Sequence, residues 1–242
     1  MGNERARQKK LAKHKKKRAD AKRRTTAIQR GSEASGHEKL ARIASSWSVD
    51  GAWLSADWDG TEDPALVSAV LVRRGAAGDL VAGIFLVDRT CLGIKSGSVR
   101  RVTRETLAGV LDQIRDLHGG VVAVDLLTLQ SVAFHAVDYA RALGFSHDPD
   151  FPLEFLGARP EALLDTPFAK LEKPRYIAGP RDDVVGVMAQ LNRARGAGNF
   201  DYVTDLAALL GPGVDFESAF EDAFEDADGE ERDGEDEPAG LP

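Results

Sequence analysis

Three residues whose side chains could take part in catalysis follow a strongly apolar segment of the 242-residue chain. Residues 80–87 carry no polar side chain, and such a run predicts a strand that is buried on both faces. Asp88 ends the run, and Cys91 and Lys95 follow it. A cysteine with a lysine nearby and a histidine from elsewhere in the chain can form an activated thiolate. Asp88, Cys91 and Lys95 are our candidate catalytic residues. A cysteine buried as a small apolar residue is the alternative.

Carboxylates suggest a second chemistry for the same region, because hard cations such as Mg²⁺ and Mn²⁺ prefer carboxylate oxygens. The acids and histidines that could gather into such a site are Asp88, Asp150, Asp182, Asp183, His135 and His147. Lys95 would then stabilise phosphoryl charge, as in a metal-dependent hydrolase or nuclease. The acids lack a diagnostic metal-ligand spacing, and a helix dipole explains Asp182 and Asp183 equally well. We therefore assign no metal ligand and predict no cofactor, and Mg²⁺ belongs to this alternative only.

The net charge of −7 conceals three regions of very different charge. Residues 1–30 contain thirteen Lys and Arg against two acids, a net charge of +11. Residues 215–242 contain thirteen acids against one arginine, a net charge of −12, and the segment between them has a net charge of −6. The segregation predicts a basic disordered arm and linker over 1–36, a single domain over 37–212 and an acidic disordered tail over 213–242.

The basic arm has the composition of a segment that contacts nucleic-acid phosphates. It has almost nothing apolar to bury, which predicts disorder in isolation, and its Ala, Lys, Arg and Gln favour a helix on binding. Lysine and arginine that neutralise phosphates release counterions without reading the base sequence. The candidate nucleic-acid-binding residues are Arg5, Arg7, Lys9, Lys10, Lys13, Lys15, Lys16, Lys17, Arg18, Lys22, Arg23 and Arg24. A basic tail that only improves solubility is the alternative.

The acidic tail carries an apolar repeat, since Phe216, Phe220 and Phe224 recur at every fourth residue. In a helix they would form one apolar stripe on an anionic peptide, a pattern typical of a segment that docks in a groove of a partner protein. This stripe is our candidate partner-binding site. The basic arm of the same chain is another candidate partner, in which case the tail would compete with nucleic acid. A solvated acidic terminus is the plain alternative.

Hydrophobic periodicity predicts an α+β domain, with an antiparallel sheet built from an N-terminal hairpin or meander and packed by three to four helices. Strands are predicted at 52–56, 65–73, 80–88, 91–94, 121–124 and 176–178. Helices are predicted at 37–45 with Ile43 on its buried side, from Thr103 to Gly119, from Thr128 to Gly144, at 161–164, and after Gly179-Pro180. The glycine-rich turn at 75–79 joins two of the strands into a hairpin.

The sequence lacks the motifs of several function classes. No apolar run of about 18 residues predicts a membrane span, and the charged N-terminal residues do not resemble a secretory signal. One cysteine cannot form an internal disulfide or a cysteine-based zinc module, which suits a reducing cytoplasm. Phosphate-binding glycine loops and a nucleophile turn are also missing. We expect a cytoplasmic location and no membrane partner.

Four groups of residues resemble an uncharacterised bacterial protein family to which we can attach no activity. They are Phe85-Leu-Val-Asp88 with Cys91-Leu-Gly93-Ile-Lys95, Tyr139-Ala140 with Leu143-Gly144-Phe145 and Asp150-Phe151, Lys173-Pro174 with Gly179-Pro180 and Asp182-Asp183, and Gly196 with Gly198-Asn199-Phe200. The resemblance spans about residues 47–205, which implies one domain. The family tends to have Pro-His ahead of the Asp-Phe pair, where this chain has His147 and Asp148.

These patterns favour a cytoplasmic nucleic-acid-associated binding protein, with RNA or the ribosome favoured over DNA as the partner. The arm would supply affinity and the domain specificity, and no recognition helix or zinc module indicates a DNA reader. The alternatives are the metal-dependent hydrolase centred on Asp88 and Lys95, and an adaptor that binds a protein through its phenylalanine-bearing tail.

Overall fold

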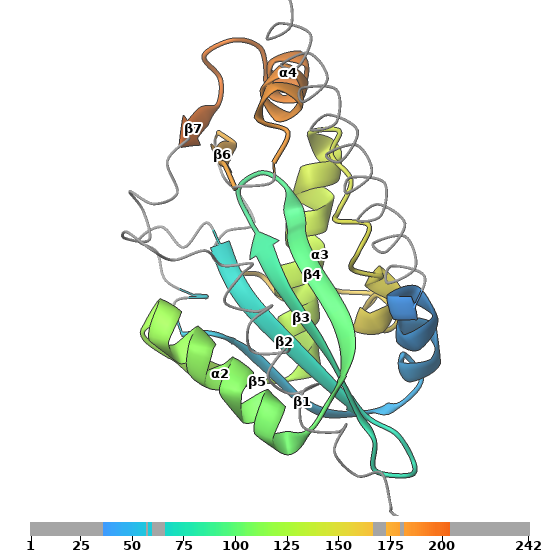
Figure 1. Ribbon diagram of the computed structural model, residues 1–242. Helices are drawn as coiled ribbons and strands as arrows, with labels where there is room; N and C mark the ends of the chain where they lie inside the picture. The colour runs from blue at the N-terminus through green and yellow to red at the C-terminus, as the bar shows by residue number, and fades with distance from the viewer. Residues whose placement is uncertain (1–35, 57, 60–65, 167–172, 180–181, 204–242) are drawn as a thin grey trace, which may run out of the picture.

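The computed structural model describes residues 36–56, 58–59, 66–166, 173–179 and 182–203. The basic arm residues from Arg5 to Arg24 and the tail stripe from Phe216 to Phe224 lie outside these ranges. The described residues form a five-stranded sheet and helices on both of its faces (Figure 1). The predicted α+β class with an antiparallel sheet is confirmed.

The sheet has the strand order β4-β3-β2-β1-β5, and every neighbouring pair is antiparallel. Its strands are β1 (Ser48–Ser55), β2 (Leu66–Arg74), β3 (Leu80–Asp88), β4 (Gly93–Val102) and β5 (Val121–Val124). The predicted hairpin of β2 and β3 is confirmed, and so is the complete burial of β3. The strand after β3, predicted at 91–94, is β4, and it extends to Val102. The polar residues Ser96, Ser98, Arg100 and Arg101 obscure the strand pattern in its second half.

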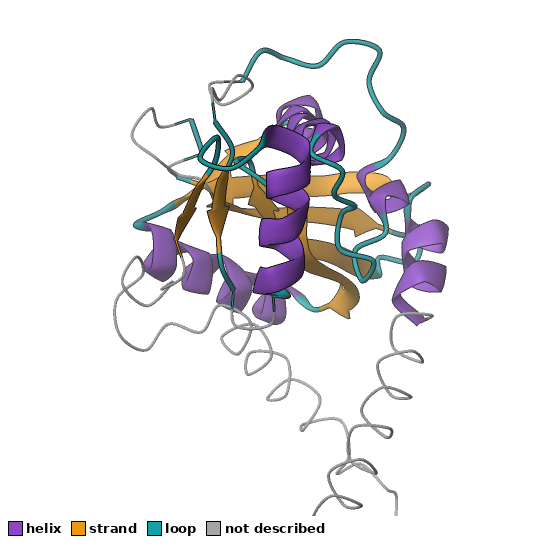
Figure 2. Cartoon of the chain, turned by 90° about the horizontal axis from the view of Figure 1, so that it is seen from above, coloured by secondary structure: helices purple, strands orange, loops and turns teal. Residues whose placement is uncertain are grey.

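Helices cover both faces of the sheet, which explains why β3 is apolar on both sides. Figures 1 and 2 show α2 (Arg104–His118) on one face and α3 (Leu126–Ala142) on the other. Val81, Phe85 and Val87 of β3 pack in the core under α3, whereas Leu80, Ala82 and Ile84 pack in the core under α2. No helix among the described residues is long and apolar enough to cross a membrane.

The helix ends follow the capping rules that the sequence suggested. The Thr103 side chain accepts a hydrogen bond from the Thr106 N–H and begins α2, and Gly119 ends it with φ 67°. Asp125 caps α3 in the same way, so this helix begins two residues before the predicted Thr128. Gly144 takes φ 83° after α3, as its predicted role requires.

The C-terminal part of the described chain forms a smaller unit. It contains the two-stranded parallel sheet of β6 (Arg175–Ile177) and β7 (Asp201–Val203), with α4 (Val184–Arg195) between them in sequence. The predicted helix start at Pro180 is wrong, because Asp183 accepts a hydrogen bond from the Gly186 N–H and sets the start at Val184. We call the described residues 173–179 and 182–203 the C-terminal unit.

Two smaller predictions are wrong for identifiable reasons. Residues 161–164 form no helix, because the Leu164 N–H donates to the Ser131 hydroxyl of α3 at 2.9 Å rather than to its own segment. The nearest helical turn is the 3₁₀ helix η1 (Leu153–Leu156). In the helix over 36–44, Ala41 and Ala44 face the core, and Ile43 is 51% exposed.

Gly83 leaves room for an aromatic ring, which gives a stability prediction. A Cβ on Gly83 would lie 2.6 Å from Phe155 Cδ1, closer than side chains in a packed core tolerate. We expect Gly83→Ala to lower the free energy of unfolding by about 1–3 kcal/mol. In α2, a Cβ on Gly109 would meet nothing within 4 Å, so Gly109→Ala should raise it by about 0.5–1 kcal/mol. Urea unfolding of the two variants tests this; equal effects of one sign would contradict it.

Candidate functional site

The four segments that carry the family resemblance lie far apart in sequence, but residues from each of them meet in one apolar cluster. Its buried members are Cys91, Leu143, Tyr176, Ala178 and Leu191, and Tyr139, Phe145, Val184 and Phe200 are among the residues packed against it. We call this cluster the junction, because it joins the β3–β4 end of the hairpin and the last turns of α3 to the C-terminal unit (Figure 1). The three candidate catalytic residues, Asp88, Cys91 and Lys95, lie at this junction.

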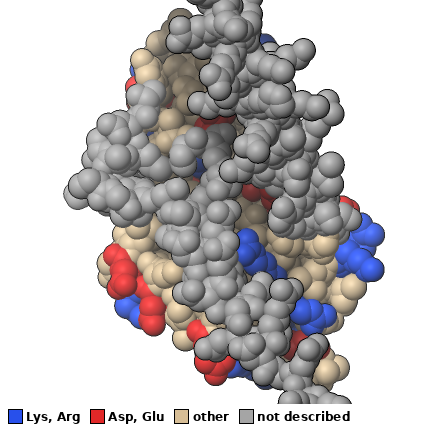
Figure 3. Space-filling view, viewed as in Figure 1, with Lys and Arg blue, Asp and Glu red and all other residues tan. Residues whose placement is uncertain are grey.

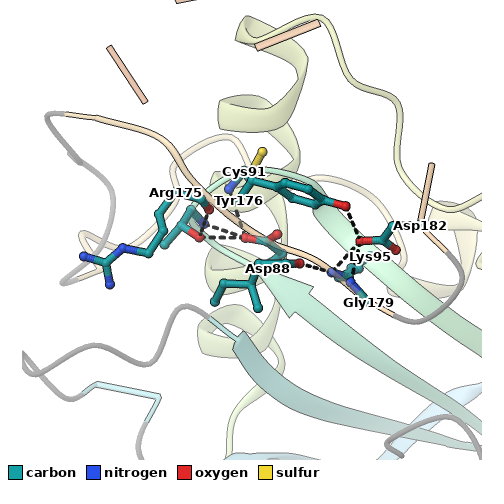
Figure 4. A network of polar contacts seen from close by, with 9 residues as sticks. Asp88, Cys91, Lys95, Arg175, Tyr176, Gly179 and Asp182 are labelled. Carbon is teal, nitrogen blue, oxygen red and sulfur yellow. Dashed lines mark hydrogen bonds and ion pairs between the residues drawn. The ribbon is translucent and has the colours of Figure 1, made fainter. Parts of the chain in front are cut away.

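Asp88 organises the turn between β3 and β4. Its carboxyl is fully buried, and Oδ1 accepts hydrogen bonds from the N–H and hydroxyl of Thr90 and from the Cys91 N–H, each at 2.9 Å. The single hydroxyl hydrogen of Thr90 is shared between Asp88 Oδ1 and the Arg175 carbonyl, which lies 2.7 Å from the hydroxyl oxygen, and the Arg175 N–H donates to the Thr90 carbonyl (Figure 4). Asp88 therefore holds the residue that ties β6 to the hairpin.

The second oxygen of this carboxyl is unusual. Asp88 Oδ2 is buried and has no hydrogen-bond partner among the described residues. Burial raises the pKa of the Asp88 carboxyl, and the charge of Lys95 and the bonds from Thr90 offset only part of this. Burial with one oxygen unsatisfied therefore favours the protonated form of Asp88 more than water favours it for an exposed aspartate.

Lys95 reaches the junction because a β-bulge redirects it. The pairing of β3 with β4 shifts between Leu86 and Val87, which leaves Lys95 as the extra residue. Its side chain is only 7% exposed, and Nζ lies 2.9 Å from Asp182 Oδ2. The ammonium also donates to the Ile177 carbonyl and lies over the Tyr176 ring, 5.6 Å from its centroid. The ion pair, the hydrogen bond and the ring contact of the Lys95 ammonium are thus all made with the C-terminal unit.

Asp182 is the centre of a second set of hydrogen bonds (Figure 4). Besides Lys95, its Oδ2 accepts from the Tyr176 hydroxyl at 2.9 Å and the Gly179 N–H at 2.8 Å. Burial alone would raise the pKa of Asp182, but Lys95 and the Gly179 N–H outweigh it and hold the pKa below its ordinary value. A Cβ on Gly179 would lie 3.1 Å from Asp182 Oδ1, so this tight loop favours glycine. The helix dipole does not explain Asp182, which lies outside α4.

The environment of Cys91 does not favour a thiolate. The side chain is fully buried, and burial raises the pKa of the thiol, an effect to which the neighbouring Asp88 adds. Lys95 is close enough to oppose this shift, but its ammonium is bonded to Asp182. The geometry fits the alternative interpretation, in which Cys91 packs as a small apolar residue.

Of the acids and histidines of the hypothetical metal site, Asp88 and Asp182 both lie at the junction, but the others make separate contacts. Asp183 caps α4, and Asp150 lies in a turn where its N–H donates to Asp148 Oδ1 at 3.0 Å. His135 Nε2 lies 2.9 Å from the Leu164 carbonyl, and burial lowers the pKa of His147. Within the described ranges no group of three or more Asp, Glu, His and Cys side chains could hold a metal ion.

Sequence reasoning missed some polar residues that the structure places in buried pairs. The sequence places Thr90 only in a tight bend that begins at Asp88, and nothing local indicates its hydrogen bond to the Arg175 carbonyl. Tyr176 was treated only as part of a strand. Ser68 Oγ lies 2.9 Å from His118 Nε2, a contact between β2 and the end of α2 that no local pattern indicates.

No family model matches the chain, and the searches of curated proteins and of solved structures likewise return no match. The resemblance to an uncharacterised bacterial family therefore stays a prediction. What the geometry does support is a joining function for the junction residues, since their polar atoms bond mainly to one another and to the backbone of the C-terminal unit.

Proposed function

We propose that this chain is a cytoplasmic nucleic-acid-associated protein, with RNA or the ribosome favoured over DNA. The observation that carries the proposal is the concentration of positive charge, because residues 1–30 hold thirteen of the chain's 32 Lys and Arg. Such a density binds phosphates by counterion release whatever the base sequence. The proposal assigns the affinity to the arm and leaves specificity to the domain.

The charge distribution on the surface of the domain supports the assignment of affinity to the arm. In the view of Figure 3, basic and acidic side chains are interspersed over the described residues. Arg74 and Arg104 both pair with Asp50, and Arg101 lies 3.7 Å from Asp79. Since these arginines share their charge with carboxylates, they offer less to a polyanion than the arm does.

The junction is the reason why we prefer binding to hydrolysis. A hydrolase centred on Asp88 and Lys95 would need both groups open to a substrate. In the structure Asp88 is fully buried, and the Lys95 ammonium is occupied by Asp182 and a backbone carbonyl. These contacts favour a structural task for the pair.

The arm gives a prediction with a measurable salt signature. We expect the full chain to bind tRNA with an affinity that falls steeply with salt, with a log–log slope of about −0.7 to −0.9 for each phosphate neutralised. Replacing Lys13, Lys15, Lys16 and Lys17 by glutamine should weaken binding at least tenfold and make the slope shallower. Fluorescence anisotropy with labelled tRNA and duplex DNA across a salt series measures both quantities.

A charge-conserving variant controls for effects other than charge. Replacing the same four lysines by arginine should leave the salt slope unchanged, because the number of cations is conserved. A chain that begins at Gly31 should show only weak binding. Equal binding by the full chain, the glutamine variant and the shortened chain would refute the proposal, and so would the absence of any binding at low salt.

A further inference from the structure

The two edges of the five-stranded sheet are protected very differently. At the β4 edge, the Asp148 N–H donates to the Ile94 carbonyl at 2.8 Å, and Asp148 Oδ2 accepts from the Gly97 N–H at 3.0 Å. The bulge at Lys95 and the exposed Arg101 add two further features that discourage strand pairing at an edge. This edge is closed to another strand along part of its length.

The β5 edge has none of these features. Its four residues, Val121 to Val124, are all apolar, without charge, proline or bulge. Among the described residues, no backbone hydrogen bond reaches the side of β5 that faces away from β1. Ala123 is exposed and the three valines are only half-buried. An apolar edge of this kind is a site where another strand can pair.

The pairing with β1 determines which β5 groups are free. The Ala56 N–H donates to the Gly120 carbonyl at 3.0 Å, one step beyond the registered pair of Ser55 and Val121. Since hydrogen-bonded and non-hydrogen-bonded pairs alternate in an antiparallel ladder, Val122 bonds to β1. The N–H and C=O groups of Val121 and Ala123 consequently point outward, spaced to match the same groups on an antiparallel strand.

We propose that the open edge of β5 pairs with β5 of a second copy of this chain, so that two five-stranded sheets join into one. A two-fold axis normal to the sheet passes beside Val122. In this register Val121 faces the partner's Ala123, and the two equivalent pairs form four N–H···O=C bonds. The axis keeps both α2 helices on one face and both α3 helices on the other, as closed two-fold symmetry requires.

The strand β5 carries no charge that would oppose this pairing, and the charges on its flanks are not the basis of it. In the last turns of α2, Arg115 forms an ion pair with Asp112, and Asp116 lies next to it; Asp125, just after β5, caps α3. An all-apolar strand adds no like-charge repulsion to the pairing itself. The same edge thus matches itself in its outward hydrogen-bonding groups, and its own residues carry no charge against a second copy.

The size of the contact sets the expected strength. Stable specific interfaces bury at least about 1,200 Å² in total, which a four-residue strand pair does not reach alone. The outer side of α2 and Leu127, which is 37% exposed at the start of α3, must supply the rest. We therefore expect dissociation in the micromolar range rather than a permanent dimer.

Disulfide trapping tests the register. In the proposed arrangement Val122 faces the partner's Val122 as a non-hydrogen-bonded pair, whose Cα atoms lie about 4.5 Å apart, close enough for a disulfide. The two copies of residue 123 are about 8 Å apart, beyond disulfide reach. Under mild oxidation of the full chain, Val122→Cys should give a linked dimer and Ala123→Cys should not. The wild type serves as the control, since Cys91 is buried.

Sedimentation velocity measures the association without a crosslink. At high micromolar concentration the full chain should approach the mass of two copies, against 26.1 kDa for one. Ala123→Lys should return it to one copy, whereas Ser98→Lys on the protected β4 edge should not. Circular dichroism verifies that both variants stay folded. A monomer at every concentration overturns the proposal, and so does equal trapping of the Val122→Cys and Ala123→Cys variants. If the edge instead accepts a strand of another protein, the chain alone stays a monomer.

Discussion

Replacing Lys95 with methionine is expected to lower the free energy of unfolding by about 3 kcal/mol, because removal of one partner leaves a buried charge uncompensated. Lys95 and Asp182 have side chains only 7% and 17% exposed, so solvent screens little of their interaction. Methionine keeps most of the aliphatic length and removes the ammonium. The loss therefore reports the charge of Asp182 left beside Tyr176 and Gly179. Urea unfolding of the full chain measures it.

An exposed ion pair provides the matched control. Arg42 lies 2.8 Å from Glu38 in the helix over 36–44, with side chains 74% and 62% exposed. Arg42→Met should change the free energy of unfolding by less than about 0.5 kcal/mol, as exposed helix pairs do. Adding Asp182→Asn to Lys95→Met should recover part of the loss, since the unpaired charge is then gone. Equal losses for the Lys95 and Arg42 variants would contradict the prediction.

The elements that could be predicted from the sequence are those whose own residues determine them. The uniform apolar run of β3 and the caps of α2 are local signals, and the structure confirms both. The polar half of β4 carries no such signal. It is a strand because β3 offers it a complete hydrogen-bonded edge along Leu80–Leu86, and nothing in the residues of β4 reports that edge.

The residues that meet at the junction could likewise be predicted from the sequence only in part. The sequence singles out the hairpin half of the junction, the segment around Asp88 and Lys95, because polar residues follow directly after a buried strand. Its other half lies more than 80 residues later in the chain, and Asp182 has a plausible local explanation as a helix-start acid. Only the fold shows that the Lys95 ammonium and Asp182 meet. Rules based on residue spacing predict local contacts and cannot predict an ion pair between residues far apart in the chain.

The unsatisfied oxygen of Asp88 makes stability depend on pH in an unusual direction. Burial raises the pKa of this carboxyl above its ordinary value of 3.8, so between these two values the folded state binds more protons than the unfolded state. Its contribution is complete below the unfolded pKa and is lost as pH rises toward the folded pKa. Asp88→Asn removes the titration, and the amide oxygen can still accept the bonds from Thr90 and Cys91. We therefore expect the asparagine variant to gain stability relative to the wild type as pH rises above about 4, by at most about 1.4 kcal/mol per pH unit, until pH passes the folded pKa of Asp88.

The same substitution at an exposed cap separates this effect from a general loss of carboxylate charge. Asp125 caps α3, and the hydrogen bond from the Thr128 N–H holds the pKa of its carboxyl below the ordinary value. Its contribution is lost only as pH falls below about 4, so Asp125→Asn should change stability by a constant amount between pH 5 and 8. Urea unfolding at intervals of pH, with both variants beside the wild type, gives the two slopes. A flat difference for Asp88→Asn would mean that Asp88 ionises normally in the folded protein. A difference that falls with pH would mean that Lys95 stabilises an Asp88 carboxylate despite its burial, and that the junction holds two negative charges against one positive charge.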